Sequence, residues 1–323
     1  MLLGEHSVVY GHPCIVTAVD QRLFLTITLN DKRSILTIDA PDVGIERYEK
    51  SLDELGKGDI PKGAKFVEIA VRNFLSLQGV PLQEGFGLYI NTKSDFSSQF
   101  GFGSSSASTV CVVKALSELF DLNLSDREIF DLSYKTILDI QGTGSGFDIA
   151  AAIYGGTLYF VTGGKTISPL SISRLPRSNR GLPIVVGYSG IKADTVSMIN
   201  VVSEKAKNDP KAVEKIYNSM ASIVARAKEA LEKNEWEHVG QLMNENQQLL
   251  SDLGVSTAKL DAMITAARSA GAYGAKLSGA GGGDCMIALS AEGKEQSVKN
   301  AIENVGGEII EVKTNAEGAR VEN

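Results

Sequence analysis

Four short segments of the sequence concentrate glycine beside hydroxyl, acidic or histidine side chains. These segments are residues 4–11 (GEHSVVYG), 101–107 (GFGSSSA), 142–148 (GTGSGFD) and 279–284 (GAGGGD). In the second segment, a Gly-x-Gly turn and three serines run directly into a long apolar pattern. Backbone N–H groups at a helix N-terminus attract anions, and glycine lets a phosphate approach the backbone closely. Residues 101–107 therefore predict a phosphate site, with a serine that only caps the helix as the alternative.

Asp148 is the best candidate in the sequence for acid–base chemistry. It follows the glycine-rich turn at residues 142–146 and precedes an apolar run at 149–153. An acid in that position can act as a general base or as a metal ligand, and a helix N-cap is the alternative role. Residues 279–283, with four glycines in five positions, predict a backbone loop that passes close to a ligand rather than a flexible hairpin loop.

Several familiar active-site patterns do not occur in the sequence. The G-x-x-x-x-G-K-[ST] motif of P-loop proteins and the H-R-D and D-F-G motifs of protein kinases are missing. So are H-E-x-x-H and G-x-S-x-G. Ser106 stands where a dinucleotide fingerprint requires its third glycine. The sequence therefore argues against P-loop proteins, protein kinases, zinc proteases and α/β-hydrolases, and only weakly supports a dinucleotide site.

The composition is that of a globular chain with a surplus of glycine. The 323 residues carry 32 Lys+Arg and 39 Asp+Glu, a net charge of −7, which argues against binding of the nucleic-acid backbone. The 33 glycines are about 10% of the chain, against an average of about 7%. Cys14, Cys111 and Cys285 are far apart, which predicts buried thiols in a reducing cytoplasm rather than disulfides or a zinc site. Since no apolar run reaches about 18–20 residues and no secretory leader pattern is present, we expect a soluble, cytoplasmic protein without a membrane partner.

The elements that must position these segments follow from the apolar periodicity. Strands are expected at residues 7–10, 14–19, 23–29, 34–38, 87–90, 155–161, 183–188, 275–278, 284–289, 309–313 and 318–321, with 23–29 and 34–38 forming a hairpin. Helices are expected at residues 64–77, 104–122, 125–140, 194–207, 210–233, 235–250, 257–270 and 294–305, the third with a capping box of Ser125 and Glu128. The order predicts an α+β fold. The stretch at 171–182 predicts a boundary between two domains, residues 1–175 and 176–323.

Three ordered motifs of the chain resemble the galactokinase–homoserine kinase–mevalonate kinase–phosphomevalonate kinase (GHMP) superfamily. Residues 4–11 look like its first motif in the mevalonate-kinase form, 101–107 like its nucleotide-phosphate loop, and 276–285 (KLSGAGGGDC) like its third motif. Residues 253–257 (LGVST) are also typical of mevalonate kinases. The resemblance spans nearly the whole chain. It implies a ribosomal protein S5 domain 2-like N-terminal, ATP-binding domain, a ferredoxin-like C-terminal domain and an active site between them.

The resemblance also implies a reaction and the residues that carry it out. The reaction would be the ATP- and Mg²⁺-dependent phosphorylation of the C5 hydroxyl of mevalonate in the isoprenoid pathway, by a protein that could form a homodimer. Asp148 would be the catalytic base and Ser105 the Mg²⁺ ligand. Residues near the substrate would be Glu5, His6, Arg22 and Thr195. Residues against the ATP phosphates would be Gly101, Phe102, Gly103, Ser104, Ser105, Ser106, Gly279, Ala280, Gly281 and Gly282.

Simpler roles are open for three residues near these motifs. Arg22 can be a surface charge, Thr195 a helix cap, and Lys276 a solvated charge on a strand. Two departures from the family pattern concern the chemistry itself. The first motif of the family begins P-G-K-x-x-L-x-G-E, but this sequence begins with Met1 and lacks that lysine, so we expect either a start site further upstream or activity without the lysine. Ile137 stands where mevalonate kinases have a Mg²⁺-binding glutamate.

A third departure concerns the substrate. Residues 144–152 and 283–285 look more like phosphomevalonate kinases. A substrate that already carries a phosphate should need a second basic cluster, for which Lys93, Arg22 and Lys192 are the plausible members. The alternative functions are therefore a phosphomevalonate kinase, another GHMP-type metabolite kinase, or a non-catalytic protein that binds ATP or an isoprenoid precursor.

Overall fold

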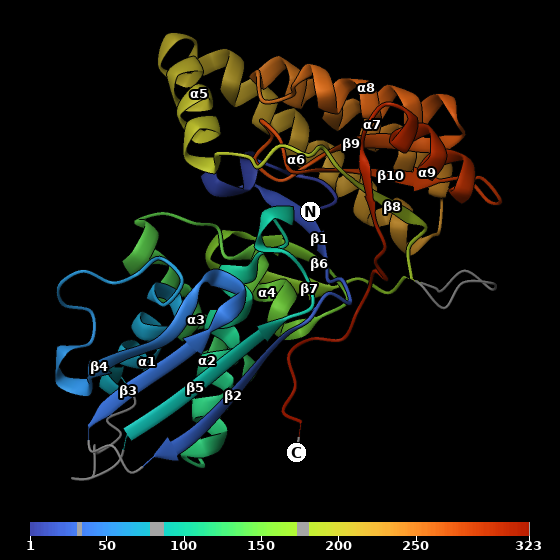
Figure 1. Cartoon of the computed structure of the whole chain (residues 1–323). Coiled ribbons are helices and arrows are strands. Elements are labelled where there is room, and N and C mark those ends of the chain that lie inside the picture. Colours follow the sequence, from blue (N-terminus) through green and yellow to red (C-terminus); the bar gives the residue numbers. More distant parts are fainter. Residues whose placement is uncertain (31–33, 78–86, 173–180, 323) are drawn as a thin grey trace. The chain divides into compact units, whose positions relative to one another are not determined.

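The computed structural model describes residues 1–30, 34–77, 87–172 and 181–322 (Figure 1). The chain divides into two compact units, each assembled from separated stretches. Unit 1 comprises Met1–Asp20, Gln99–Gly101 and Gly155–Glu317, and unit 2 comprises Gln21–Ser98, Phe102–Tyr154 and Gly318–Asn323. The predicted domain boundary, between residues 175 and 176, lies outside the described residues.

The described residues of unit 2 form a four-stranded sheet with helices packed against it. The strand order is β2 (Leu23–Asn30), β5 (Gly87–Ser94), β3 (Ile35–Ala40) and β4 (Ile45–Ser51). The helices are α1 (Lys65–Leu77), α2 (Ser104–Leu119), α3 (Asp126–Gln141) and α4 (Phe147–Tyr154). In Figure 1, α1 and α2 lie behind the sheet. Phe74 of α1 and Val110, Val113 and Leu116 of α2 are fully buried, as expected for the apolar faces of helices that cover a sheet.

The hairpin predicted between residues 23–29 and 34–38 is wrong. β2 pairs antiparallel with β5, whereas β3 pairs parallel with β5 and antiparallel with β4. Leu36 and Ile38 are fully buried, so β3 occupies a central position in the sheet. β2 is an edge strand of the sheet, and accordingly half of its residues are exposed. The turn signal after β2 therefore marks the end of a strand and does not determine its partner.

The capping box predicted at the start of α3 is confirmed. The backbone N–H of Glu128 donates to Ser125 Oγ at 3.3 Å, and the backbone N–H of Ser125 donates to Glu128 Oε2 at 2.8 Å. These two bonds satisfy N–H groups that have no partner within the helix. They define where α3 begins, and α3 in turn supports the turn that leads to Asp148.

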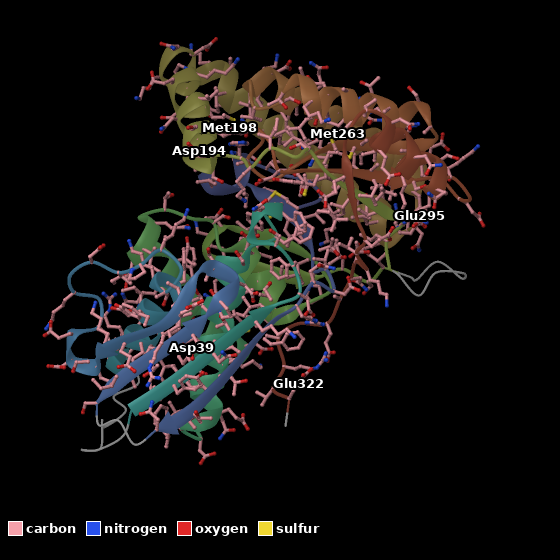
Figure 2. All side chains as sticks on the ribbon, in the orientation of Figure 1. Asp39, Asp194, Met198, Met263, Glu295 and Glu322 are labelled. Carbon is pink, nitrogen blue, oxygen red and sulfur yellow. The ribbon has the colours of Figure 1, made fainter. Side chains whose placement is uncertain are left out.

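In the described part of unit 1, the strands form two sheets. One has the order β1 (Pro13–Thr17), β6 (Thr157–Val161) and β7 (Thr166–Pro169), and the other has the order β11 (Glu308–Ile310), β8 (Ile184–Tyr188), β10 (Cys285–Ser290) and β9 (Ala272–Ser278). The helices are α5 (Thr195–Asn208), α6 (Pro210–Glu232), α7 (Trp236–Leu253), α8 (Ala258–Ser269) and α9 (Glu295–Asn304). Met263, labelled in Figure 2, is one of the fully buried residues of the core between these helices and the second sheet.

Two predicted strands are wrong and two strands were not predicted. Residues 7–10 form a short 3-10 helix, Ser7–Tyr10, which lies between His6 with φ 59° and Gly11 with φ 90°. A four-residue apolar run cannot distinguish a strand from a helical turn by its pattern. Residues 318–321 belong to no strand. β4 and β7 were missed, in the case of β4 because its sequence, IERYEKS, is mostly polar. The other 3-10 helices are Pro41–Val43, Leu52–Glu54, Ser98–Phe100 and Thr162–Gly164.

The cysteines lie where the sequence predicts them, among apolar residues. Cys14 and Cys285 are buried and Cys111 is half-buried, and none of them forms a disulfide within the described residues. Burial raises the pKa of the Cys111 thiol to about 11 and that of the Cys285 thiol to about 12, so both are protonated and unreactive at neutral pH. Of the helices that the structure describes, none is long and apolar enough to cross a membrane.

Candidate active site

The predicted phosphate site in unit 2 is the N-terminus of α2. Gly103 is the N-cap residue, with φ 76° and ψ 33°, and Ser104, Ser105 and Ser106 form the first helical turn. A glycine N-cap has no side chain to bond the first N–H groups of the helix, so these groups are available to an anion. The alternative, in which a serine caps the helix, is wrong, because the serines lie inside the helix.

Asp148 lies directly against this N-terminus, within the same unit. A Cβ atom on Gly103 would be only 3.3 Å from Cγ of Asp148, so glycine at 103 leaves room for the carboxyl group. Asp148 is the second residue of α4 and therefore not its N-cap. Burial raises the pKa of Asp148 from 3.8 to about 6. The site thus combines a carboxylate, which is ionised at neutral pH, with the positive end of a long helix.

Side chains of α3 hold the turn that presents Asp148. The hydroxyl of Tyr134 donates to the carbonyl oxygen of Gly144 at 2.9 Å. Gly146 has φ 88°, and a Cβ atom there would lie 3.0 Å from Cδ2 of Tyr134. The glycines of residues 142–146 therefore allow the turn to pack closely on an aromatic side chain. This packing fixes the start of α4 and with it the position of Asp148.

The position at which mevalonate kinases have a magnesium-binding glutamate is apolar in this chain. Ile137 is buried, and its Cγ2 atom would be 3.4 Å from a Cβ atom on Gly144. Asp139, the nearest acid on α3, accepts hydrogen bonds from Arg72 at 3.0 Å, Asn73 at 3.0 Å and Lys135 at 2.7 Å. Asp139 is thus part of an ion-pair cluster. Within the described residues, no group of three or more His, Cys, Asp or Glu side chains is placed to hold a metal, which leaves Ser105 and Asp148 as oxygen donors beside α2.

In unit 1, Glu5 lies in a closed polar network. Its carboxylate, 1% exposed, forms an ion pair with Lys276, whose side chain is fully buried. Asn246 of α7 donates to the second carboxylate oxygen of Glu5 at 3.2 Å. Burial lowers the pKa of Lys276, and the neighbouring Glu5 carboxylate opposes that change. The simpler interpretation of Lys276, a solvated charge on a strand, is therefore wrong.

His6 is the next residue and contacts the glycine-rich loop. Its ring Nε2 lies 2.8 Å from the carbonyl oxygen of Ala280. The ring is largely buried, and burial lowers its pKa, which favours the neutral imidazole. Nε2 then carries the proton and donates to Ala280, so that Nδ1 is the ring acceptor. Ser7 is buried as well, and its hydroxyl donates to the carbonyl oxygen of Gly4 at 3.3 Å, which tightens the turn that presents His6.

The glycine-rich loop of residues 279–283 is packed against its own unit. A Cβ atom on Gly281 would be 2.2 Å from the carbonyl oxygen of Val255, and one on Gly282 would be 2.7 Å from Sδ of Met198. The N–H of Gly282 also donates to Val255 at 2.8 Å. Gly279 differs, because a Cβ atom there meets nothing within 4 Å. The loop is therefore not a flexible hairpin, and its open side is at Gly279.

Asp284 closes the loop and holds the segment that leads to α5. Its carboxylate accepts a hydrogen bond from the N–H of Ala193 at 2.9 Å and lies 3.4 Å from Nζ of Lys192. A Cβ atom on Gly101 would be 2.7 Å from Oδ2 of Asp284. Lys192 also donates to the carbonyl oxygen of Gln99 at 3.2 Å. Within unit 1, Asp284 therefore brings the start of the second motif, Lys192 and the end of the third motif together.

The remaining predicted residues are located as follows. Thr195 is exposed and is the first residue of α5. The capping role falls to Asp194, labelled in Figure 2 near Met198, because its carboxylate accepts from the N–H of Ser197 at 3.3 Å. Arg22 is half-buried in unit 2 and donates to the carbonyl oxygen of Gly318 at 3.4 Å. Phe102 packs on Phe96 with ring centroids 6.1 Å apart.

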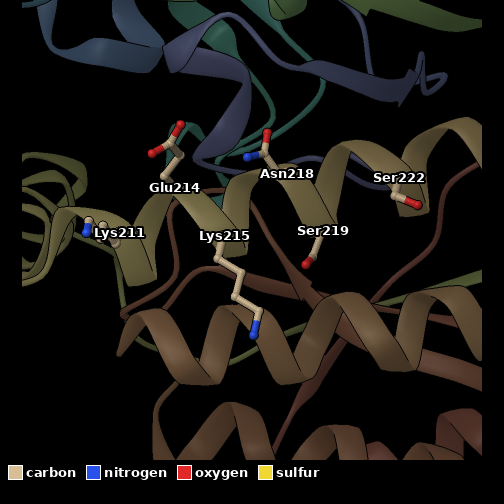
Figure 3. Close-up of a pocket in the computed structure, with 6 residues that line it drawn as sticks. All are labelled: Lys211, Glu214, Lys215, Asn218, Ser219 and Ser222. Atoms are coloured by element: carbon tan, nitrogen blue, oxygen red, sulfur yellow. The ribbon is translucent and has the colours of Figure 1, made fainter.

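A shallow polar depression lies elsewhere on unit 1 (Figure 3). The residues that line it all come from α6: Lys211, Glu214, Lys215, Asn218, Ser219 and Ser222. Their spacing follows one stripe of a single helix, which is typical of a solvated surface. None of the predicted site residues lines it.

The structure therefore groups the predicted residues into two sets, one in each unit. Unit 2 joins the α2 N-terminus to Asp148, and unit 1 joins Glu5 and His6 to the third motif. The side-chain oxygen of Gln247, the residue after Asn246, accepts a hydrogen bond from the N–H of Leu277 at 2.9 Å. The sequence did not single out Asn246 and Gln247, because neighbouring polar residues in a helix resemble a solvated face. Asp284 was present in the third motif as an acid directly after the glycines, which was the available signal for it.

Comparison with known proteins gives a consistent set of similarities. The family descriptions "GHMP kinases N terminal domain" and "GHMP kinases C terminal" match residues 65–156 and 227–308. A mevalonate kinase of Pyrococcus abyssi is 38% identical over 330 residues, which cover 100% of this chain and 95% of that protein. The crystal structure of Methanococcus jannaschii mevalonate kinase aligns with a TM-score of 0.80 and 27% identity over 97% of this chain and 94% of that one. The structure of L. major mevalonate kinase in complex with R-mevalonate aligns with a TM-score of 0.76 and 28% identity over 99% and 94% of the two chains.

Proposed function

The chain belongs to the GHMP kinase family, and on that premise we propose that it is a mevalonate kinase, which transfers the γ-phosphoryl group of ATP to the C5 hydroxyl of mevalonate. The similarity to the Pyrococcus abyssi mevalonate kinase over the full chain supports the choice of substrate. The structural observation that carries the mechanism is the contact of Asp148 with Gly103 at the start of α2. We also propose that residues 1–175 form the ATP-binding domain and 176–323 the C-terminal domain. The protein would work in the cytoplasm, whose reducing conditions suit cysteines that form no disulfide.

Asp148 is the proposed catalytic base. With a pKa of about 6, the carboxylate is mostly unprotonated at pH 7 and above, and it is more basic than an exposed aspartate. Both properties favour removal of a proton from an alcohol as it attacks a phosphoryl group. Phosphoryl transfer depends mainly on positioning and on charge stabilisation. A carboxylate next to a helix N-terminus suits this reaction, because the carboxylate can position the alcohol and the helix N-terminus can stabilise phosphate charge.

The nucleotide would be bound by backbone N–H groups. The first turn of α2, at Ser104, Ser105 and Ser106, has a glycine N-cap and fits a phosphate. We propose that Gly101, Phe102 and Gly103 continue this surface, with Gly279, Ala280, Gly281 and Gly282 on the other loop. Gly279 is the position of that loop with open space above it.

Magnesium would be held through a hydroxyl oxygen, because this ion prefers oxygen ligands. Ser105, in the first turn of α2, offers such an oxygen. A single protein ligand fits Mg²⁺, which usually keeps several waters and is bound by one or two protein groups together with substrate phosphates. When bound, ATP would supply the phosphoryl group, and Mg²⁺ would offset the negative charge of the phosphates.

The substrate side of the proposal rests on His6, Arg22 and Thr195, because both carboxylate oxygens of Glu5 are already bonded within the protein. His6 retains one ring nitrogen after the contact with Ala280, and Thr195 is exposed at the start of α5. For a substrate that already carries a phosphate, the candidate cations are less suitable. Lys192 is engaged with Asp284 and Gln99 and Arg22 with Gly318, while Lys93 is a solvent-exposed residue of β5. We therefore favour mevalonate over its phosphorylated form.

A coupled assay of ADP release tests this proposal. The full chain is supplied with ATP and Mg²⁺, and with either R-mevalonate or 5-phosphomevalonate. We expect turnover with R-mevalonate at a kcat of about 1–100 per second, the usual range for kinases, and little with 5-phosphomevalonate. Turnover with 5-phosphomevalonate alone would identify a phosphomevalonate kinase. Nucleotide binding without turnover of either substrate would identify a non-catalytic binder.

A further inference from the structure

The Glu5–Lys276 pair is the most deeply enclosed ion pair among the described residues, with side chains 1% and 0% exposed. Lys276 belongs to β9, and the glycine-rich loop begins three residues later. Lys276 also donates to the carbonyl oxygen of Leu277. Both carboxylate oxygens of Glu5 are occupied, one by Lys276 and the other by Asn246 at 3.2 Å. A carboxylate bonded in this way has little capacity left for a substrate.

A second contact ties the same segment to the same loop. His6 follows Glu5 and lies with Nε2 2.8 Å from the carbonyl oxygen of Ala280. Two consecutive residues of the first motif are thus bound on either side of Gly279, the loop glycine with open space above it. His6 adopts a φ of 59° and a ψ of −54°, a backbone conformation that is rare for residues other than glycine. Such strain persists only where the surrounding structure over-determines it.

Helix α7 secures the other side of this arrangement. Asn246 and Gln247 are both buried. While Asn246 binds Glu5, the side-chain oxygen of Gln247 accepts from the N–H of Leu277 at 2.9 Å, and its amide nitrogen donates to Ser256 at 3.1 Å. The end of β9 is therefore held from two directions, by α7 and by Glu5. These bonds hold the end of β9, from which the loop backbone continues to Gly279.

We propose that Glu5 is a positioning residue, which acts through Lys276 to hold the glycine-rich loop in the shape that receives the nucleotide and does not contact the acceptor substrate. This inference rests on the proposed role of the loop in nucleotide binding. It differs from the expectation that the family resemblance implies, in which Glu5 lines the substrate pocket. A buried ion pair adds little stability compared with apolar residues of the same size, but removing one partner leaves the other charge buried and unpaired. The main effect of the Glu5–Lys276 pair is therefore to hold the glycine-rich loop in one conformation.

The test compares Glu5→Gln, Lys276→Met and the double variant. ADP affinity is measured by calorimetry, and kcat and the KM for mevalonate are measured by ADP release. We expect each single variant to bind ADP about ten- to a hundredfold more weakly, as for a shift of about 1 Å in a binding loop, with the KM for mevalonate unchanged. The double variant, which buries no unpaired charge, should recover most of the ADP affinity.

The exposed ion pair between Arg226 and Glu245 provides a matched control in the same unit, since it also joins two elements but is about half exposed. Arg226→Met and Glu245→Gln should leave ADP affinity and both kinetic constants unchanged. If a single variant at Glu5 or Lys276 does not fold, the double variant decides the question alone.

Contact of Glu5 with the substrate would give a different pattern. Glu5→Gln would then raise the KM for mevalonate with ADP affinity unchanged, and the additional Lys276→Met substitution would not rescue it. That result, or a folded double variant with a raised KM for mevalonate, overturns the inference. If the wild-type chain does not phosphorylate mevalonate, the proposed function fails, but the ADP measurements still decide whether Glu5 acts on the loop.

Discussion

The second and third glycine-rich motifs differ in what their glycines face. In the second motif, Gly101 and Gly103 lie against the carboxyl groups of Asp284 and Asp148. In the third motif, Gly281 faces a carbonyl oxygen of its own unit, Gly282 the thioether of Met198, and Gly279 open space. At Gly103 glycine therefore makes room for the proposed base, whereas at Gly281 and Gly282 it allows close internal packing.

This difference shows that a high number of glycines in a segment does not by itself identify a ligand-binding loop. A missing Cβ marks a position where something approaches the backbone closely, but the approaching group can be protein or ligand. At α2 the close neighbour is the proposed base, so substitutions should affect the reaction first. In the loop at 279–283 the close neighbours are structural, so substitutions should affect folding first.

Asp148→Asn should produce the largest change in rate. Loss of the base should lower kcat about 10²- to 10⁴-fold, while the α2 N-terminus should still bind ADP with nearly unchanged affinity. Steady-state kinetics and calorimetry on the same preparation measure both quantities. Asp131→Asn is the matched control, because Asp131 is an exposed acid on α3 that pairs with Arg127. A large loss of ADP affinity in Asp148→Asn would instead assign Asp148 to metal binding or to structure.

Gly281→Ala should produce the largest loss of stability. The added Cβ would lie 2.2 Å from the carbonyl oxygen of Val255, and Gly281 has a φ of 79°. The steric clash and the backbone strain would therefore both destabilise the folded state. We expect the free energy of unfolding to fall by about 3–5 kcal/mol, measured by urea denaturation. Gly279→Ala, where only the backbone is strained, should lose about 1–2 kcal/mol. Equal losses in the two variants would mean that the packing of Gly281 is not what fixes the loop.

Gly103→Ala should lower the activity more than the stability, which is the reverse of the effect expected for Gly281→Ala. A Cβ atom there would be 3.3 Å from Cγ of Asp148, a contact that a small movement of the carboxyl group can relieve. We expect kcat to fall about ten- to a hundredfold, because the base is displaced, with a stability loss of about 1–2 kcal/mol from the positive φ. Kinetics and urea denaturation of one preparation check both. A normal kcat with a large stability loss would make Gly103 structural, like Gly281.

Asp148 should also lower stability at high pH. Its pKa is raised from 3.8 to about 6 by burial, so the native state binds more protons than the unfolded state between these values, and stability falls as pH rises through them. Asp148→Asn removes this penalty. We expect its unfolding free energy to exceed that of the wild type by about 1–2 kcal/mol at pH 8 and to match it near pH 4. The difference at pH 8 is smaller than the full pKa change implies, because Asp148 is only partly buried. Urea titrations at the two pH values measure the difference. Equal unfolding free energies of the variant and the wild type at pH 8 would mean that the pKa of Asp148 is not raised in the folded protein.

Local patterns in the sequence predicted most elements but not how they pair. Helix α3, with its capping box at Ser125, was predictable because the signal lies within four residues. The partner of β2 was not, because β5 follows more than fifty residues later and nothing local distinguishes it from β3. A turn signal in the sequence shows where a strand ends but not which strand pairs with it. The pairing depends on which strands together bury the most apolar surface.

Lys276 illustrates the same limit at the site. In sequence it is a lysine in a short strand, a residue type that is almost never fully buried unless it is paired. Its partner, Glu5, is 271 positions away, and the four buried residues in a row at 274–277 follow no alternating pattern. The prediction of Asp148 and of the serines at 104–106 as site residues needed only local signals, because both closely follow a glycine-rich turn in the sequence.

The most direct test of the account is ³¹P NMR of a reaction that contains the full chain, ATP, Mg²⁺ and R-mevalonate, repeated with Asp148→Asn. If Asp148 is the base of a mevalonate kinase, the wild-type spectrum gains a phosphomonoester signal of mevalonate 5-phosphate in step with the signals of ADP, and the variant shows almost none. Inorganic phosphate in place of the phosphomonoester, or equal product formation by the variant, would contradict it.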